Sequence, residues 1–142
     1  MKIAIVSDHA GYNLKLKVKD YLEEKGYDVK DMGAFSSESS DYPDFAHPLA
    51  EAVEQKKYDF GISLCGTGNG ISMAANKHPG IRSALCWSIE IAELARKHND
   101  ANICALPARF IDLDTAKGIL DSFLTTEFEG GRHKRRIEKI PL

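Results

Sequence analysis

Five short apolar runs alternate along the chain with longer segments whose apolar residues recur every three or four positions. This alternation constrains the fold more than any other feature. The runs, which we predict to be strands, occupy 2–7, 27–32, 59–65, 82–87 and 102–107. Four of them are apolar almost without interruption, as is typical of parallel strands covered on both faces. Five repeats of strand and helix predict an α/β fold: a three-layer α/β/α, Rossmann-like domain around a five-stranded parallel sheet.

The segments between these runs have the spacing of helices that bury one face. Their apolar positions are Leu14, Val18, Tyr21 and Leu22; Phe45, Leu49 and Val53; Ile91, Leu94, Ala95 and His98; and Ala116, Ile119, Leu120 and Phe123. The stretch LKLKVK (14–19) also alternates strictly, which is a strand pattern. We predict a helix there because good helix formers continue to a C-terminal glycine signal at Gly26.

One domain, 1–142, is expected, since the chain shows no internal repeat, low-complexity tract or linker. A long irregular stretch, GAFSSESSDYPDF (33–45), predicts a loop of a length that is often functional. The net charge of −2 argues against nucleic acid and anionic membranes as partners. No apolar run approaches the ~18 residues of a membrane span, and the first is too short for a signal peptide.

Three cysteines, Cys65, Cys86 and Cys104, form neither a disulfide framework nor a metal-binding spacing. Reduced thiols beside apolar runs suit a reducing compartment. We therefore expect a cytoplasmic protein with no metal site.

Polar residues follow the predicted strands at the edge where sheets of this kind bind ligands. Asp8 and His9 follow the first strand, Cys65 the third and Arg109 the fifth. His98 and Asn99 end a helix just before the fifth strand, and we expect them at the same site. Asp8 and His9 have a second interpretation, as a helix cap and a buried polar pair.

A glycine-rich turn follows Cys65 in the sequence SLCGTGNGISMAANK (63–77). Gly66, Gly68 and Gly70 let backbone N–H groups approach an oxygen-rich ligand closely. The turn lacks the Lys-Ser/Thr pair of a P-loop, so nucleotide binding is poorly supported, and packing alone also produces such turns. This turn and Cys65 each have a structural and a functional interpretation.

Cys65 is either a small buried hydrophobe or a reacting group. A free cysteine is more often simply buried, and Cys86 and Cys104 fit that interpretation because they lie inside apolar strands. Cys65 instead precedes a predicted helix N-terminus, whose dipole favours the thiolate. A thiolate beside N–H donors is suited to removing a proton next to a carbonyl while the donors stabilise the oxygen of the enediolate.

Two further features admit a functional interpretation. His98 continues an apolar stripe, so a buried structural histidine is the commoner explanation, although a helix C-terminus also favours its protonated form. On a terminal helix predicted at about 128–138, Arg132 and Arg136 lie four residues apart and form a two-armed phosphate clamp. A solvated helix face is the alternative for this basic segment.

Five motifs follow one another along the chain: SDHAGYNLK (7–15), DYPDFA (41–46), LCGTGNGISMAANKHPGIRSALC (64–86), HNDANI (98–103) and GGRHKRRIEKI (130–140). Together and in this order they resemble ribose-5-phosphate isomerase type B, a family that also includes allose-6-phosphate isomerases and galactose-6-phosphate isomerase subunits. The resemblance implies interconversion of D-ribose 5-phosphate and D-ribulose 5-phosphate through an enediolate, as in the pentose phosphate pathway, without metal or cofactor. It also implies the strand order 2-1-3-5-4 and a homodimer or dimer of dimers with shared active sites.

The resemblance further implies a role for each matching residue. Cys65 would be the base that moves a proton between C1 and C2, Thr67 would hold the reacting oxygens, and His98 would open the furanose ring, with Asp8 and Tyr42 near it. Arg132 and Arg136 would come from the neighbouring subunit. The implied substrate contacts are Asp8, His9, Tyr42, Gly66, Gly68, Asn69, Gly70, Asn99, Arg109, Arg132 and Arg136.

Two positions depart from the family pattern. Asn69 stands where the family usually has an aliphatic residue, and Pro107 where it usually has glycine. Asn69 is expected to alter the pocket beside the sugar, which keeps a hexose-6-phosphate isomerase open as an alternative. A sugar-phosphate sensor without catalysis is a second alternative, but it would not need both Cys65 and His98.

Overall fold

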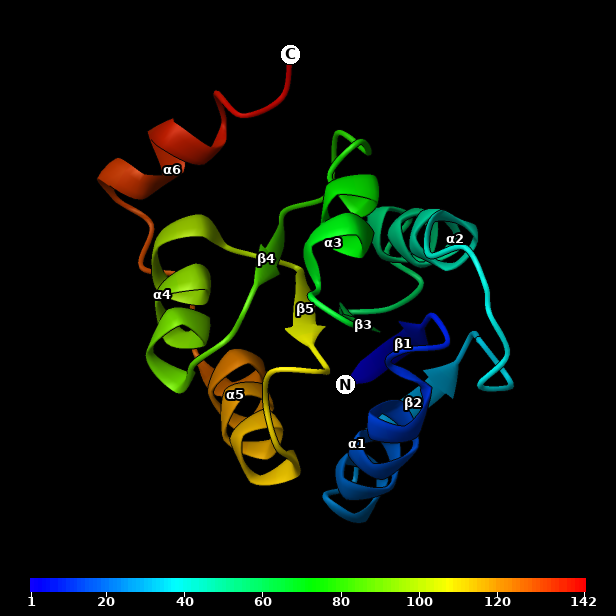
Figure 1. Ribbon diagram of the computed structural model, residues 1–142. Coiled ribbons are helices and arrows are strands. Elements are labelled where there is room, and N and C mark those ends of the chain that lie inside the picture. The colour runs from blue at the N-terminus through cyan, green and yellow to red at the C-terminus, as the bar shows by residue number, and fades with distance from the viewer.

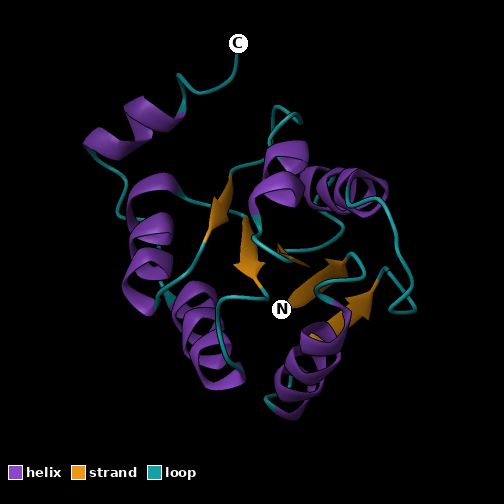
Figure 2. Cartoon of the chain, viewed as in Figure 1, coloured by secondary structure: helices purple, strands orange, loops and turns teal.

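A five-stranded parallel sheet is the middle layer of the structure, a computed structural model that describes residues 1–142 (Figure 1, Figure 2). The strands are β1 (Lys2–Ser7), β2 (Asp28–Asp31), β3 (Phe60–Cys65), β4 (Ser83–Leu85) and β5 (Ile103–Pro107). Their order is β2-β1-β3-β5-β4, and every neighbouring pair is parallel. The predicted fold class is confirmed, as is the strand order that the family resemblance implied.

Helices cover both faces of the sheet (Figure 2). They are α1 (Tyr12–Glu24), α2 (Pro43–Glu54), α3 (Asn69–Ala75), α4 (Ile89–Asn99), α5 (Leu113–Thr125) and α6 (Arg132–Ile137). Helices α1, α4 and α5 contribute to one apolar core, and α2 and α3 to the other. Helix α6 packs on α4, outside these layers (Figure 1). None of the helices combines the length and the apolar character that crossing a bilayer requires.

Alternate residues of each central strand face opposite cores, which explains the continuous apolar runs. In β1, Ile3 and Ile5 belong to the core under α1 and α5, whereas Ala4 and Val6 belong to the core under α2 and α3. All four are completely buried. A strand covered on both faces has no solvent side, so it needs no polar alternation.

The helix predicted from residue 14 is confirmed, and its alternation has a structural cause. Val18 and Leu22 are buried, and Gly26 ends the helix in a left-handed conformation with φ of +93°. Leu16 is 40% exposed, whereas Lys15 is fully buried. The Lys15 ammonium donates a hydrogen bond to the Asp31 carboxylate at 2.8 Å, which compensates for its burial. The alternation therefore arises because Leu16 faces solvent and Lys15 faces inward.

Three predicted boundaries are wrong. Helix α2 begins at Pro43, inside the stretch predicted as a loop, because proline is favoured at the first helical position. Strand β4 is only three residues long. Helix α6 begins at Arg132 instead of about residue 128, since Gly130 and Gly131 adopt positive φ angles of 70° and 57° that no right-handed helix contains.

Candidate active site

The ends of β1, β3 and β5 meet at one edge of the sheet and form a cavity of about 230 Å³, called the cleft below. It is lined by Asp8, His9, Ala10, Tyr42, Cys65, Gly66, Thr67, Gly70 and Arg109. The shared edge of parallel strands thus brings together residues that are up to a hundred positions apart in the chain. Of the implied contacts at this edge, Gly68 and Asn69 do not line the cavity.

Cys65 ends β3 beneath the glycine turn, and its side chain is only 5% exposed. Its Sγ accepts a hydrogen bond from the Gly68 N–H at 3.2 Å. This hydrogen bond ties the sulfur to the backbone of the glycine turn. The backbone on both sides is fixed as well, because the Cys65 carbonyl accepts a hydrogen bond from the Ala108 N–H at 2.9 Å.

Cys86 and Cys104 are completely buried in the core under α4 and α5, as their sequence context predicted. Burial raises the pKa of the Cys104 thiol well above its usual range, and hydrogen bonding with Cys86 raises it further. Both therefore act as small hydrophobes. Cys65 is the only cysteine that faces a cavity.

Two positions in the turn require glycine. Gly68 has a φ of +78°, and a Cβ there would lie 2.4 Å from the Leu85 side chain. A Cβ on Gly70 would lie 2.5 Å from Cζ of Tyr42. The absence of side chains therefore lets Gly68 aim its N–H at the sulfur and lets the Tyr42 ring lie against the turn.

Asp8 lines the cleft and holds the turn that precedes α1, but the helix-cap interpretation is wrong, because the N-cap of α1 is Gly11. Its Oδ1 accepts hydrogen bonds from the N–H groups of Ala10 and Gly11, at 2.9 and 3.1 Å, just before α1 begins. The side chain is 6% exposed and lines the cleft. These two hydrogen bonds fix one carboxylate oxygen and thereby fix where the other one points.

His9 is oriented by the loop between β2 and α2. The Ser40 N–H donates to His9 Nδ1 at 3.2 Å, and the His9 N–H donates to Ser40 Oγ at 3.1 Å. Since Nδ1 acts as an acceptor, the proton of the neutral imidazole lies on Nε2. His9 therefore offers an N–H donor from its Nε2 side. Opposite it, Arg109 is anchored through its backbone N–H to the Gly66 carbonyl at 3.0 Å.

His98 and Asn99 lie at the opposite edge of the sheet, so the prediction that they share the edge with Cys65 in one chain is wrong. Helix α4 connects the end of β4 to the start of β5 and must run antiparallel to the strands. Its last residues therefore reach the amino edge of the sheet. For the same reason His98 is not a neighbour of Asp8 and Tyr42 within the chain.

His98 instead contacts His133, a residue to which the sequence analysis assigned no role. The two rings stack with centroids 4.3 Å apart and planes 12° apart. Glu129, which precedes α6, lies four residues before His133, with 3.8 Å between Oε2 and Nε2. The only sequence signal was this four-residue spacing, because the stacking partner is distant in the chain. His98, Asn99, Glu129, Arg132, His133 and Arg136 are called the α4–α6 cluster below.

The pKa of His133 lies below its ordinary value. Burial is the main cause, and positive charge on His98, Arg132 and Arg136 lowers the pKa further, whereas the Glu129 carboxylate opposes the shift. His133 is therefore neutral at pH 7. Arg132 and Arg136 are exposed, and neither forms a salt bridge, while Lys134 pairs with Glu138 at 3.5 Å.

His98, Glu129 and His133 have the residue types of a zinc site, with ligand atoms within 4.8 Å of one another. The nearly parallel ring planes oppose this function. An imidazole lone pair lies in the plane of its ring, so two stacked rings cannot direct their lone pairs at one ion. The arrangement is a stacked pair and not a preformed metal centre.

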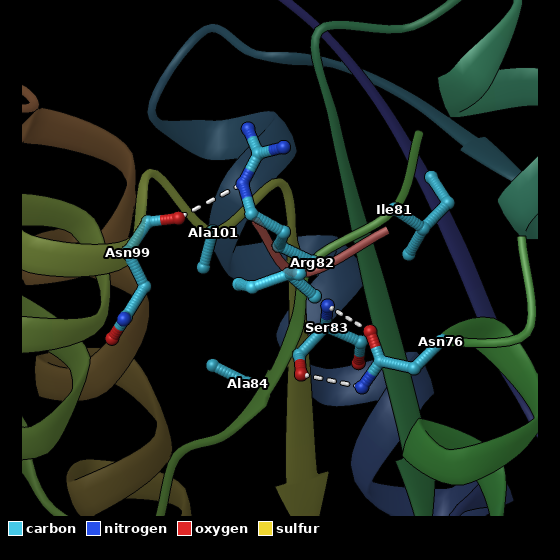
Figure 3. Close-up of a pocket in the computed structure, with 8 residues that line it drawn as sticks. Asn76, Ile81, Arg82, Ser83, Ala84, Asn99 and Ala101 are labelled. Atoms are coloured by element: carbon cyan, nitrogen blue, oxygen red, sulfur yellow. Dashed lines mark hydrogen bonds between the residues drawn. The ribbon is translucent and has the colours of Figure 1, made fainter. Parts of the chain in front are cut away.

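A larger cavity, about 350 Å³, opens near the amino end of β4 (Figure 3). Asn99 is its only member among the predicted site residues, and its polar groups mostly bind one another. Arg82 Nε donates to the Asn99 carbonyl at 2.9 Å, and the Ser83 N–H donates to Asn76 Oδ1 at 2.7 Å (Figure 3). No cysteine, histidine or carboxylate lines this cavity.

Neither departure from the family pattern lines the cleft. Asn69 is exposed at the first position of α3, so an effect of this residue on the pocket stays a prediction. Pro107 is buried at the end of β5, in register with Cys65. Its fixed φ suits the end of a strand.

Comparison with known proteins gives consistent results. A family model described as Ribose/Galactose Isomerase matches residues 3–140. The chain is 47% identical over 139 residues to ribose-5-phosphate isomerase B of Escherichia coli (strain K12), covering 98% of this chain and 93% of that protein. The structure of ribose-5-phosphate isomerase B from Clostridium thermocellum matches with a TM-score of 0.97 and 54% identity, covering 99% of this chain and 95% of that one. A Mycoplasma genitalium ribose-5-phosphate isomerase B with bound ribulose-5-phosphate matches with a TM-score of 0.94 and 45% identity, over 98% and 93% of the two chains.

Proposed function

The chain belongs to the ribose/galactose isomerase family, and on that premise we propose that it interconverts D-ribose 5-phosphate and D-ribulose 5-phosphate with Cys65 as the base. The observation that carries the proposal is the Cys65 sulfur in the cleft, 3.2 Å from the Gly68 N–H. Aldose–ketose isomerisation needs a base beside C1 and C2 and donors for the oxygens. The cleft supplies both.

The proton transfer follows from this geometry. The Cys65 thiolate removes the C2 proton of the open-chain aldose, and the electron pair of the broken C–H bond forms the enediolate. The thiol then returns a proton to C1 while the O2–H proton passes to O1, which gives the ketose. Backbone N–H groups of the turn and the Thr67 hydroxyl stabilise the negative oxygen.

Ring opening needs a second acid–base group, which must take the O1 hydroxyl proton and give a proton to the ring oxygen. His98 can do both, but it lies at the far edge of its own chain. We therefore assign this step to His98 of a second copy in a homodimer. In a two-fold dimer each copy would complete the cleft of the other.

The same assembly supplies the phosphate site. Arg109 and His9 lie in the cleft, and Arg132 and Arg136 of the second copy would approach from outside, with Asn99 beside the sugar. Unpaired, exposed guanidinium groups are free to bind a phosphate dianion through paired hydrogen bonds. We also place the protein in the cytoplasm, because its three cysteines are free thiols.

Ribulose 5-phosphate formation from ribose 5-phosphate, measured with EDTA present, tests the proposal. Cys65→Ala should lower kcat by about 10²- to 10⁴-fold, since it removes the base. Cys86→Ala, a buried cysteine outside the cleft, is the matched control and should stay active. Unchanged turnover in Cys65→Ala would contradict the assignment. An inactive parent chain would point to a hexose 6-phosphate, or to a binding protein if those are not turned over.

A further inference from the structure

His98 lacks any hydrogen bond that would fix its imidazole. It is half-buried at the end of α4, and its ring forms no hydrogen bond within the chain. The stack against His133, with 4.3 Å between centroids, is the contact that orients the ring. An acid–base group that must reach two oxygens of a sugar depends on a fixed direction.

His133 itself is held firmly. It is only 9% exposed. The segment between α5 and α6 is tied to α4, because the Glu129 N–H donates to the Lys97 carbonyl at 3.1 Å. The Glu129 carboxylate also faces His133, with 3.8 Å between Oε2 and Nε2. A fixed ring under a less constrained ring is a platform for stacking.

The charges around His133 also suit this role. His98 faces it from α4, Glu129 from the segment between α5 and α6, and Arg132 and Arg136 from its own helix. Burial and the neighbouring positive charges lower the pKa of His133, which leaves it neutral at pH 7. A neutral partner does not repel a proton on His98.

We propose that His133 is a positioning residue for ring opening, whose stacked imidazole fixes the direction in which His98 presents its proton to the sugar phosphate. The proposal rests on the function proposed above. It assigns His133 to one step only, since proton transfer between C1 and C2 is the work of Cys65.

The test compares two substrates in the dimeric enzyme. Ribose 5-phosphate must have its ring opened, whereas 4-deoxyribose 5-phosphate lacks the O4 hydroxyl that closes a furanose. His133→Ala should lower kcat for ribose 5-phosphate about 10- to 100-fold and leave kcat for the 4-deoxy sugar within about twofold of the parent, as only the first needs an oriented His98. His133→Phe keeps a ring to stack on and should recover most of the loss.

Lys134→Ala, in the same helix with its side chain exposed, is the control and should match the parent. An equal loss with both substrates, a rise in KM alone, or a Phe variant as slow as the Ala variant would each overturn the positioning role. The first two would indicate that His133 only docks the helix of Arg132 and Arg136. An inactive parent overturns the proposed function as well, which separates the two failures.

Discussion

The cleft and the α4–α6 cluster contain the two halves of the proposed chemistry, and they are built in different ways. In the cleft, the donor at the sulfur of Cys65 is the backbone N–H of Gly68. Cys65 is fixed at the end of β3, in register with Pro107 of β5, and Gly68 is the N-cap of α3. In the α4–α6 cluster, the functional groups are the exposed side chains of Arg132 and Arg136 and the half-buried side chain of His98. His98 is oriented by its ring stack against His133. The first site is fixed by the sheet and the second by side-chain packing.

This difference matches what each half has to do. Moving a proton between adjacent carbons requires positions accurate to fractions of an ångström, which backbone at the end of a sheet provides. Binding a phosphate and a sugar hydroxyl from outside tolerates more freedom, so exposed arginines serve. On the proposed mechanism, neither half forms a complete site in one chain.

The largest expected effect follows from that division. Cys65→Ala and His98→Ala should each fall below about 1% of parent activity. When the two are refolded together, half of the dimers contain both chains, and one of their two clefts has both groups intact. Activity should recover to about a quarter of the parent value, because a two-fold dimer forms equivalent shared sites. The recovered activity is measured as turnover of ribose 5-phosphate.

A mixture of Cys65→Ala with Arg109→Ala is the matched control. Both residues come from the same cleft, so no hybrid contains an intact site and activity should not recover. Recovery in this control, or none in the Cys65 and His98 mixture, would mean that the two halves do not combine across an interface.

The second prediction concerns the backbone in the cleft. Gly68→Ala should lower kcat/KM about 100-fold, because the new Cβ lies 2.4 Å from the Leu85 side chain and displaces the N–H at Cys65. Gly26→Ala is the control, since Gly26 also has a positive φ but has open space around it. Both should lose about 1–2 kcal/mol of stability, while only Gly68→Ala loses activity. Similar activity in the two would show that backbone placement in the cleft is not critical.

The third prediction tests the exposed half. Arg132→Ala and Arg136→Ala should each raise KM for ribose 5-phosphate about tenfold or more, because a charged hydrogen bond contributes about 1.5–3 kcal/mol. Arg135→Ala, between them on another face of α6, should stay within about twofold. Steady-state kinetics measure these values. An equal effect at Arg135 would indicate a general attraction of the helix for phosphate instead of a two-armed clamp.

The sheet and the cleft were predictable from the sequence for one physical reason. Strands buried on both faces must be apolar throughout, and parallel strands all end at the same edge. A polar residue just after each run, such as Asp8, Cys65 or Arg109, therefore had to lie in one place. The preference of proline for the first helical position was overlooked at Pro43. The start of α2 was therefore predicted wrongly, but the position of the cleft was not.

The α4–α6 cluster was less predictable, since its contacts depend on tertiary packing. His98 precedes β5 in sequence, which suggested the edge where Cys65 lies, although the helix before a strand ends at the other edge. His133 received no role because the partner of its ring stack, His98, is far away in the chain. Hydrophobic periodicity describes one helix or strand at a time, whereas the stack of His98 on His133 joins two helices.

The smallest expected effect is on the pH dependence of stability, and it arises from His133 in the α4–α6 cluster. The lowered pKa of His133 means that the folded chain binds this proton less tightly than the unfolded chain. The stability that neutral His133 contributes is therefore complete above the ordinary pKa of about 6.5. It is lost as the pH falls from that value toward the lowered pKa of the folded chain. The Tm of the parent should fall more between pH 7.5 and 5.5 than that of His133→Phe, with Lys134→Ala following the parent. Parallel curves for parent and His133→Phe would show that the buried ring does not couple the α4–α6 cluster to pH.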